Sequence, residues 1–150
     1  GFLPGSLVKK MDPWTRPIFD ILLEFYPQRD LDHMVQNGVI EISPLAFMRG
    51  RTFKQSFIIA DEMQNSSPNQ MLMLATRLGE QSRMVITGDL SQVDLPAGQP
   101  SGLAEAVSLL DNIKGVGMIH LSGQDVVRHP VVARILQAYE AGQKQQNTSK

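Results

Sequence analysis

The chain has 150 residues, a net charge of −1 and no cysteine. The length suits one domain with its own hydrophobic core, and the near-neutral charge excludes a strongly basic field of the kind that by itself indicates nucleic-acid binding. The missing cysteines exclude disulfides and thiolate metal sites, and because neither a membrane-spanning apolar stretch nor a signal peptide is recognisable, we expect a cytoplasmic protein with no membrane partner.

The first third of the chain is expected to be mostly helical. Residues 13–26 carry apolar side chains at a helical period, and Asp12 is the predicted N-cap, with proline at the first helical position. A short second helix is predicted over 31–36 and ends at Asn37-Gly38. Residues 39–42 alternate weakly between apolar and polar and predict a strand.

From residue 57 onward, predicted strands and helices alternate. The predicted strands begin at Phe57, cover Met84–Asp89 and cover Gly117–Leu121. The first predicted helix begins at a capping box formed by Ser67, Pro68 and Gln70 and ends at Gly79. The second covers Leu103–Leu110, and the third begins at Pro130. Such alternation indicates an α/β fold, with a mostly parallel sheet covered by helices on both faces.

Two adjacent carboxylates, Asp61 and Glu62, follow the first of these strands. Ligands of open α/β sheets bind at the carboxyl ends of the strands. Neighbouring carboxylates repel each other unless a positive charge is close, and hydrated Mg²⁺ commonly supplies it. This is the Walker B arrangement, in which the Asp holds the metal and the Glu polarises the attacking water. The alternative is a buried strand that simply ends in a solvated turn, and this segment alone does not decide between the two.

Polar groups end all three predicted strands: Asp61-Glu62, then Thr87-Gly88-Asp89 with Gln92, then Gln124-Asp125 with Arg128. This repetition favours a phosphate-handling site, because a purely structural sheet has little need for polar groups at three successive strand ends. Gln92 is a candidate γ-phosphate sensor, and Arg128 is a candidate arginine finger. The alternatives are ordinary turn chemistry for Asp89 and an exposed helix start for Arg128.

A compact basic loop precedes the strand that begins at Phe57. It contains Arg49 and Arg51, separated by one glycine. The commoner fate of such a pair is a solvated loop. Its place before the Walker B strand also makes it a candidate contact for phosphate or nucleic acid.

No Walker A pattern, G-x-x-x-x-G-K-[ST], occurs in the chain, so the predicted site lacks the loop that cradles the phosphates. Either an upstream part that carries this loop has been lost, or the Walker B interpretation of Asp61 and Glu62 is wrong. We expect a domain over residues 1–141. Residues 142–150 are polar and lack a hydrophobic run, so we expect a disordered tail.

Six sequence blocks carry a family resemblance: Gly1–Gly5, Asp12–Pro17, Ser43–Thr52, Ile59–Asn65, Thr87–Pro96 and Asp125–Pro130. On these blocks the sequence resembles the PhoH-like proteins, the phosphate-starvation-inducible ATPases, over nearly the whole chain up to about Glu140. The blocks Phe-Met-Arg-Gly-Arg-Thr and Asp-Val-Val-Arg-His-Pro are the most specific of them.

The resemblance implies a three-layer P-loop NTPase core similar to that of superfamily 1 helicases, with ATP and Mg²⁺ as cofactors. It also implies that this core is truncated here at its N-terminus, because the family's Walker A segment lies upstream of the Gly1–Gly5 block. In this comparison Asp61 and Glu62 match the Walker B motif, Gln92 matches the phosphate-sensing Gln, and Arg128 looks like the arginine of the last motif. Met63 departs from the alanine that is usual in the family. The resemblance also implies an ATPase linked to RNA metabolism or phosphate starvation, and it suggests a homo-oligomer. The rival interpretation is an RNA-associated binding module without efficient hydrolysis.

Overall fold

The structure is a computed structural model, and it describes residues 7–122, 125, 127, 129–136 and 138–139. The chain divides into two compact units, Gly1–Leu109 and Leu110–Lys150, which are described separately. Within the described ranges, every helix is too short or too polar to cross a membrane.

Helix α1 spans Leu7–Leu22, so the prediction of a helix that starts after an Asp12 N-cap and reaches residue 26 is wrong at both ends. Pro13 and Pro17 lie inside the helix. Proline fixes φ near −65°, which suits any helical position, although each interior proline removes one backbone hydrogen bond. The local sequence therefore could not reveal whether Pro13 opens the helix or interrupts it.

Helix α2 spans Gln28–Gln36 and ends at the C-cap Asn37, as predicted, with Gly38 at a φ of 70°. The strand predicted directly after it, over residues 39–42, is absent from the structure. The backbone N–H groups of Val39 and Ile40 instead donate to the Met34 carbonyl at 2.8 and 3.0 Å. The end of α2 therefore takes up the donors that a strand would need for its ladder.

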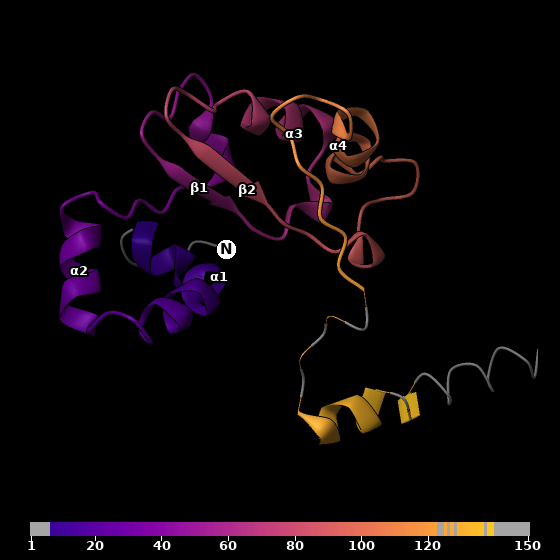
Figure 1. The fold of residues 1–150 in the computed structure, drawn as a ribbon, viewed down its shortest axis with the longest axis horizontal. Helices are drawn as coiled ribbons and strands as arrows, with labels where there is room; N and C mark the ends of the chain where they lie inside the picture. Colours follow the sequence, from indigo (N-terminus) through magenta and orange to yellow (C-terminus); the bar gives the residue numbers. More distant parts are fainter. Residues whose placement is uncertain (1–6, 123–124, 126, 128, 137, 140–150) are drawn as a thin grey trace, which may run out of the picture. The chain divides into compact units, whose positions relative to one another are not determined.

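The sheet is formed by β1, Phe57–Ala60, and β2, Arg83–Ile86. The strands lie side by side and run parallel (Figure 1). Ala60 pairs with Ile86 at their carboxyl ends. Both strands were predicted. The third predicted strand, over residues 117–121, is wrong, because these residues lie in irregular backbone. Within the described residues the sheet therefore has two strands.

Helices α3 and α4 follow β1 and β2 respectively (Figure 1). Helix α3 spans Pro68–Ala75 and begins with the predicted capping box: Ser67 Oγ accepts from the Gln70 N–H, and Gln70 Oε1 accepts from the Ser67 N–H. It ends four residues before the predicted end at Gly79. Thr76 is its C-cap, and the Thr76 hydroxyl donates to the carbonyls of Leu72 and Met73. Helix α4 spans Gly102–Leu110, close to the predicted range.

One face of the sheet carries the core. The buried cluster consists of Met63, Met71, Leu74 and Leu103, and partly buried side chains that include Ala60, Met84 and Ile86 of the strands pack against it. The 3-10 turn η1, Leu45–Met48, contributes further apolar contacts to this core.

The opposite face of the sheet is open within the described residues. The paired positions on that face are Phe57 with Arg83 and Ile59 with Val85. Phe57 is 66% exposed and Ile59 is 52% exposed. The prediction that β1 is buried on both sides therefore applies to only one side here.

In the second unit, residues 130–136 are helical and Pro130 is the first helical residue, as predicted. The predicted tail over 142–150 lies outside the described residues.

Candidate functional site

The carboxyl ends of β1 and β2 place Asp61 beside Thr87. The strand pairing continues past the last strand residues, since the Thr87 N–H donates to the Ala60 carbonyl at 2.9 Å and the Met63 N–H donates to the Thr87 carbonyl at 2.9 Å. The Thr87 hydroxyl donates to Oδ1 of Asp61. Both side chains are exposed. Parallel pairing thus brings the two predicted strand tips together at one edge of the sheet.

Glu62 has a left-handed backbone conformation, with φ of 56° and ψ of 42°. This conformation is uncommon for a residue with a Cβ, and such residues gather at functional sites. Glu62 immediately precedes the 3-10 turn η2, Met63–Asn65. Its Oε2 accepts a hydrogen bond of 2.6 Å from Nε2 of Gln64.

Gln64 is the part of the site that the sequence reasoning missed. It is only 4% exposed, and its Oε1 accepts from the Asp89 N–H at 3.3 Å. Its carbonyl accepts from the Ser101 hydroxyl at 2.7 Å. The available signal was its position two residues after Glu62, since a polar side chain beside the buried Met63 must find partners when it folds inward.

Asp89 and Gln92 belong to one small turn, the 3-10 turn η3, Leu90–Gln92. Asp89 caps this turn and accepts from the Ser91 hydroxyl at 2.7 Å and from Gln92 Nε2 at 2.7 Å. The hydrogen bonds from Ser91, then that from Gln92, hold the pKa of the Asp89 carboxyl below its ordinary value of 3.8. The capping role matches the turn alternative for Asp89, and the predicted sensor Gln92 hydrogen-bonds this capping carboxylate.

A further hydrogen bond joins the loops after the two strands. Oδ1 of Asn65, the last residue of η2, accepts from the Asp94 N–H at 2.7 Å. The loop that carries Glu62 is therefore tied to the loop that carries Gln92 at two points, Gln64 and Asn65.

Of the third predicted tip, the structure describes only Asp125. Gln124 and Arg128 lie outside the described residues. Asp125 belongs to the second unit, where it accepts from the Ser122 N–H at 2.6 Å. The arginine-finger prediction for Arg128 stays a prediction.

The two arginines of the basic loop have different surroundings. Arg51 forms a two-bond ion pair with Glu41, at 2.5 and 2.9 Å, and its guanidinium lies 4.7 Å from the centre of the Phe53 ring. The Arg51 hydrogen bonds hold the Glu41 pKa below its ordinary value of 4.5. Arg49 is exposed, and its side chain has no partner within the described part of the chain. The Arg51 guanidinium is thus held by Glu41 and Phe53, whereas the Arg49 side chain is exposed to solvent.

The side chains at the strand tips offer one carboxylate ligand, Asp61, for a hard cation such as Mg²⁺. In the described ranges no cluster of three or more Asp, Glu, His or Cys side chains could hold a metal. Mg²⁺ on a nucleotide needs fewer, because it takes one or two carboxylates together with phosphate oxygens and water. Thr87 binds Oδ1 of Asp61, and Oδ2 has no partner among the described residues.

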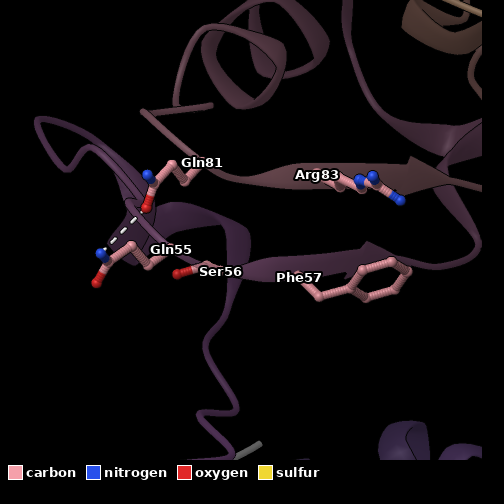
Figure 2. Close-up of a pocket in the computed structure, with 5 residues that line it drawn as sticks. All are labelled: Gln55, Ser56, Phe57, Gln81 and Arg83. Carbon is pink, nitrogen blue, oxygen red and sulfur yellow. Dashed lines mark hydrogen bonds between the residues drawn. The ribbon is translucent and has the colours of Figure 1, made fainter.

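A shallow hollow lies at the other end of the strands (Figure 2). Its volume is about 420 Å³, and its lining consists of Gln55, Ser56, Phe57, Gln81 and Arg83. Nε2 of Gln55 donates to Oε1 of Gln81 at 3.2 Å across one side of it. Ligands of parallel sheets bind at the carboxyl ends, so this hollow is not the counterpart of the predicted nucleotide site.

Fold and site together define an α/β protein whose parallel strands end in a paired carboxylate and a hydroxyl. The family model for PhoH-like protein matches residues 1–140. The chain is 51% identical over 140 residues to the PhoH-like protein of Bacillus subtilis. The aligned region covers 93% of this chain and 44% of that protein. It is 48% identical over 149 residues to the PhoH-like protein of Synechocystis, and this aligned region covers 99% of this chain and 44% of that protein.

A more distant relative is Protein PhoH of Escherichia coli K12, which is 39% identical over 141 residues, covering 93% of this chain and 40% of that protein. The chain belongs to the PhoH-like protein family. It spans less than half the length of these curated relatives.

Proposed function

We propose that this chain supplies the Walker B half of an ATP-binding and ATP-hydrolysing site. The observation that carries the proposal is the strand-tip arrangement, in which Asp61 and Glu62 follow β1 and Thr87 of the neighbouring parallel strand bonds Asp61. A carboxylate at the carboxyl end of such a strand is where Mg²⁺ and the nucleotide phosphates are bound in P-loop enzymes.

The four polar positions take separate roles in this proposal. Asp61 holds Mg²⁺, which when bound neutralises charge on the phosphates, and Glu62 orients and deprotonates the attacking water. Gln92 senses the γ-phosphate from the turn after β2. Arg128 adds positive charge near the transferring phosphoryl group.

The phosphate-cradling loop of this site comes from outside these 150 residues, because they contain no Walker A pattern. The length of the relatives supports this, since the matched region covers 44% of the first two. The same remainder would extend the sheet into the three-layer P-loop core similar to superfamily 1 helicases and would cover the open face around Phe57 and Ile59.

Calorimetric titration of Mg-ATP into the complete protein that carries this chain tests the proposal. The Asp61→Asn variant should lose most of the Mg²⁺-dependent part of ATP affinity, because it removes the charged metal ligand. Asp94→Asn is the matched control, because it makes the same substitution on an exposed carboxylate of the neighbouring loop. If Asp61→Asn and Asp94→Asn bind Mg-ATP as the unaltered protein does, the metal assignment is wrong.

The second candidate is an RNA-associated module in which the nucleotide is a switch or is not hydrolysed, in the setting of RNA metabolism or the phosphate-starvation response. The exposed Arg49 favours it, because an unpaired guanidinium on a loop suits a phosphate contact. Arg49→Ala should weaken RNA binding and reduce the slope of log affinity against log salt by about one. An RNA affinity that changes neither with the salt concentration nor with Arg49→Ala would contradict this candidate.

The oligomer implied by the family resemblance is also a proposal. An arginine finger can be supplied by a neighbouring subunit, so Arg128 could act on the site of a second copy. Mixing Glu62→Gln with Arg128→Ala protein would restore hydrolysis if the two residues act across subunits. No restoration would limit Arg128 to its own chain.

A further inference from the structure

The side chain of Gln64 is buried between the two strand-tip loops. Its 4% exposure is low for a polar side chain, and polar groups at such depth are retained when they are bonded. Both ends of the amide are in use: one faces the Glu62 carboxylate and the other faces the Asp89 N–H.

The chemistry of its partners fixes the orientation of the amide. The Asp89 N–H is a donor, so it must face Oε1 of Gln64. Nε2 is then the end that meets Oε2 of Glu62, an acceptor, at 2.6 Å. A flipped amide would set donor against donor on one side and acceptor against acceptor on the other.

The backbone around Gln64 is held as firmly as its side chain. Its carbonyl accepts from the buried Ser101 hydroxyl at 2.7 Å. Gly88 closes over it, because a Cβ at Gly88 would lie 2.9 Å from Gln64 Oε1 and 2.6 Å from Leu103 Cδ2. Gln64 is therefore a fixed point, whereas Glu62 is an exposed side chain with several rotatable bonds.

We propose that Gln64 is a positioning residue, which holds the Glu62 carboxylate in its working orientation and couples it to the loop that carries Asp89 and Gln92. The proposal rests on the proposed function, in which Glu62 acts on the attacking water. Because one amide accepts from the Asp89 N–H and donates to Glu62, the orientation of the Glu62 carboxylate depends on where the Asp89 loop lies.

Two substitutions remove the link in different ways. Gln64→Met keeps the length and the volume of the side chain but removes both hydrogen bonds. Gln64→Glu keeps an acceptor for the Asp89 N–H but turns a carboxylate toward Glu62. In the complete protein, we expect kcat for ATP hydrolysis to fall by roughly 10- to 100-fold in both, because a small misplacement of a catalytic group costs about that much. The dissociation constant for Mg-ATP should stay within about threefold of the unaltered value, because the substitutions leave the groups proposed to bind the nucleotide in the ground state unchanged.

Ser101→Ala is the matched control. It removes the hydrogen bond to the Gln64 carbonyl and the one that the Ser101 hydroxyl accepts from the Ala104 N–H, but it leaves both hydrogen bonds of the Gln64 amide in place. It should lower the unfolding temperature and leave kcat within about twofold. A loss of kcat in Ser101→Ala as large as that in Gln64→Met would overturn the proposal, because local packing alone would then explain both.

A double-mutant cycle with Glu62→Gln separates positioning from a merely structural role. If Gln64 acts through Glu62, adding Gln64→Met to Glu62→Gln leaves the residual rate unchanged. Independent losses that multiply would overturn the proposal, and so would a folded Gln64→Glu protein with unaltered kcat. A Glu62→Gln protein that hydrolyses ATP normally would instead refute the proposed function itself, and the positioning role would fail with it.

Discussion

Gly88 is required at the end of β2 for space and not for backbone conformation. The nearest atoms to an added Cβ would be Leu103 Cδ2 and Gln64 Oε1, at 2.6 and 2.9 Å, whereas its φ lies outside the left-handed range. Both neighbours are side chains, so they can yield, but one belongs to the core and the other holds Glu62. The crowding at one glycine therefore links packing to the proposed chemistry.

Gly88→Ala should destabilise the fold by about 1–3 kcal/mol, the usual cost of overpacking a filled site. It should also lower the ATPase rate, because the Gln64 amide must move. Chemical denaturation of the complete protein measures the first effect. Gly117→Ala is the control, because a Cβ there meets nothing within 4 Å. Equal stability of the two variants would contradict the packing account.

Glu41 and Arg51 give a pH-dependent contribution to stability. The folded-state pKa of Glu41 is below its ordinary 4.5, with the Arg51 hydrogen bonds as the main cause. The pair therefore stabilises the fold above pH 4.5, and its contribution is lost as the pH falls through the lower folded pKa. The contribution is small at all pH values, because both side chains are substantially exposed.

Arg51→Gln should lower the unfolding temperature at pH 7, and the difference from the unaltered protein should shrink as the pH falls below 4.5. Part of the difference in unfolding temperature should not depend on pH, because Arg51→Gln also removes the contact of the guanidinium with the Phe53 ring. Thermal unfolding across this pH range measures both parts. Arg49→Gln, which removes an exposed guanidinium without a partner in the described residues, should show no such trend. A difference that grows on acidification would contradict the assignment.

At the scale of elements, the capping box of α3 is the clearest case of local sequence that determines local structure. Ser67→Ala removes the acceptor for the Gln70 N–H and should cost about 1 kcal/mol of unfolding free energy. Ser67→Asn should stay close to the unaltered protein, because Asn is an equally good N-cap. Urea unfolding compares the three proteins. A Ser67→Ala protein as stable as Ser67→Asn would show that the cap contributes nothing.

Elements with local signals could be predicted from the sequence, and elements that depend on distant partners could not. β1, β2, α3 and α4 carry apolar periodicity or caps within their own residues. The weak alternation over 39–42 also predicted a strand, but the Val39 and Ile40 N–H groups donate to the Met34 carbonyl at the end of α2. The stretch 117–121 is apolar, yet it pairs with no neighbour in the described structure.

The candidate site follows the same rule. Asp61, Glu62 and Thr87 were predicted together, because parallel strands must end at one edge, and the structure brings Asp61 and Thr87 into contact. The position of Gln64 beside Glu62 was a signal, but its link to Asp89 could not be predicted, because Asp89 is 25 residues further along the chain.

At the scale of the whole molecule, the sheet has one filled face and one open face within the described residues. The filled face holds the core of Met63, Met71, Leu74 and Leu103. The open face and the missing Walker A pattern agree with the length of the relatives, of which this chain covers 44% or less. Both features fit the proposed function, in which this chain supplies one half of an ATP site.

The most direct test of the central claim is the rate of ATP hydrolysis by the complete protein with Glu62→Gln. Glutamine keeps the shape of the side chain and can still accept a hydrogen bond from Gln64, but it cannot take a proton from water. The account predicts a rate at least about 100-fold lower, with Mg-ATP affinity retained. Hydrolysis at the unaltered rate would contradict it.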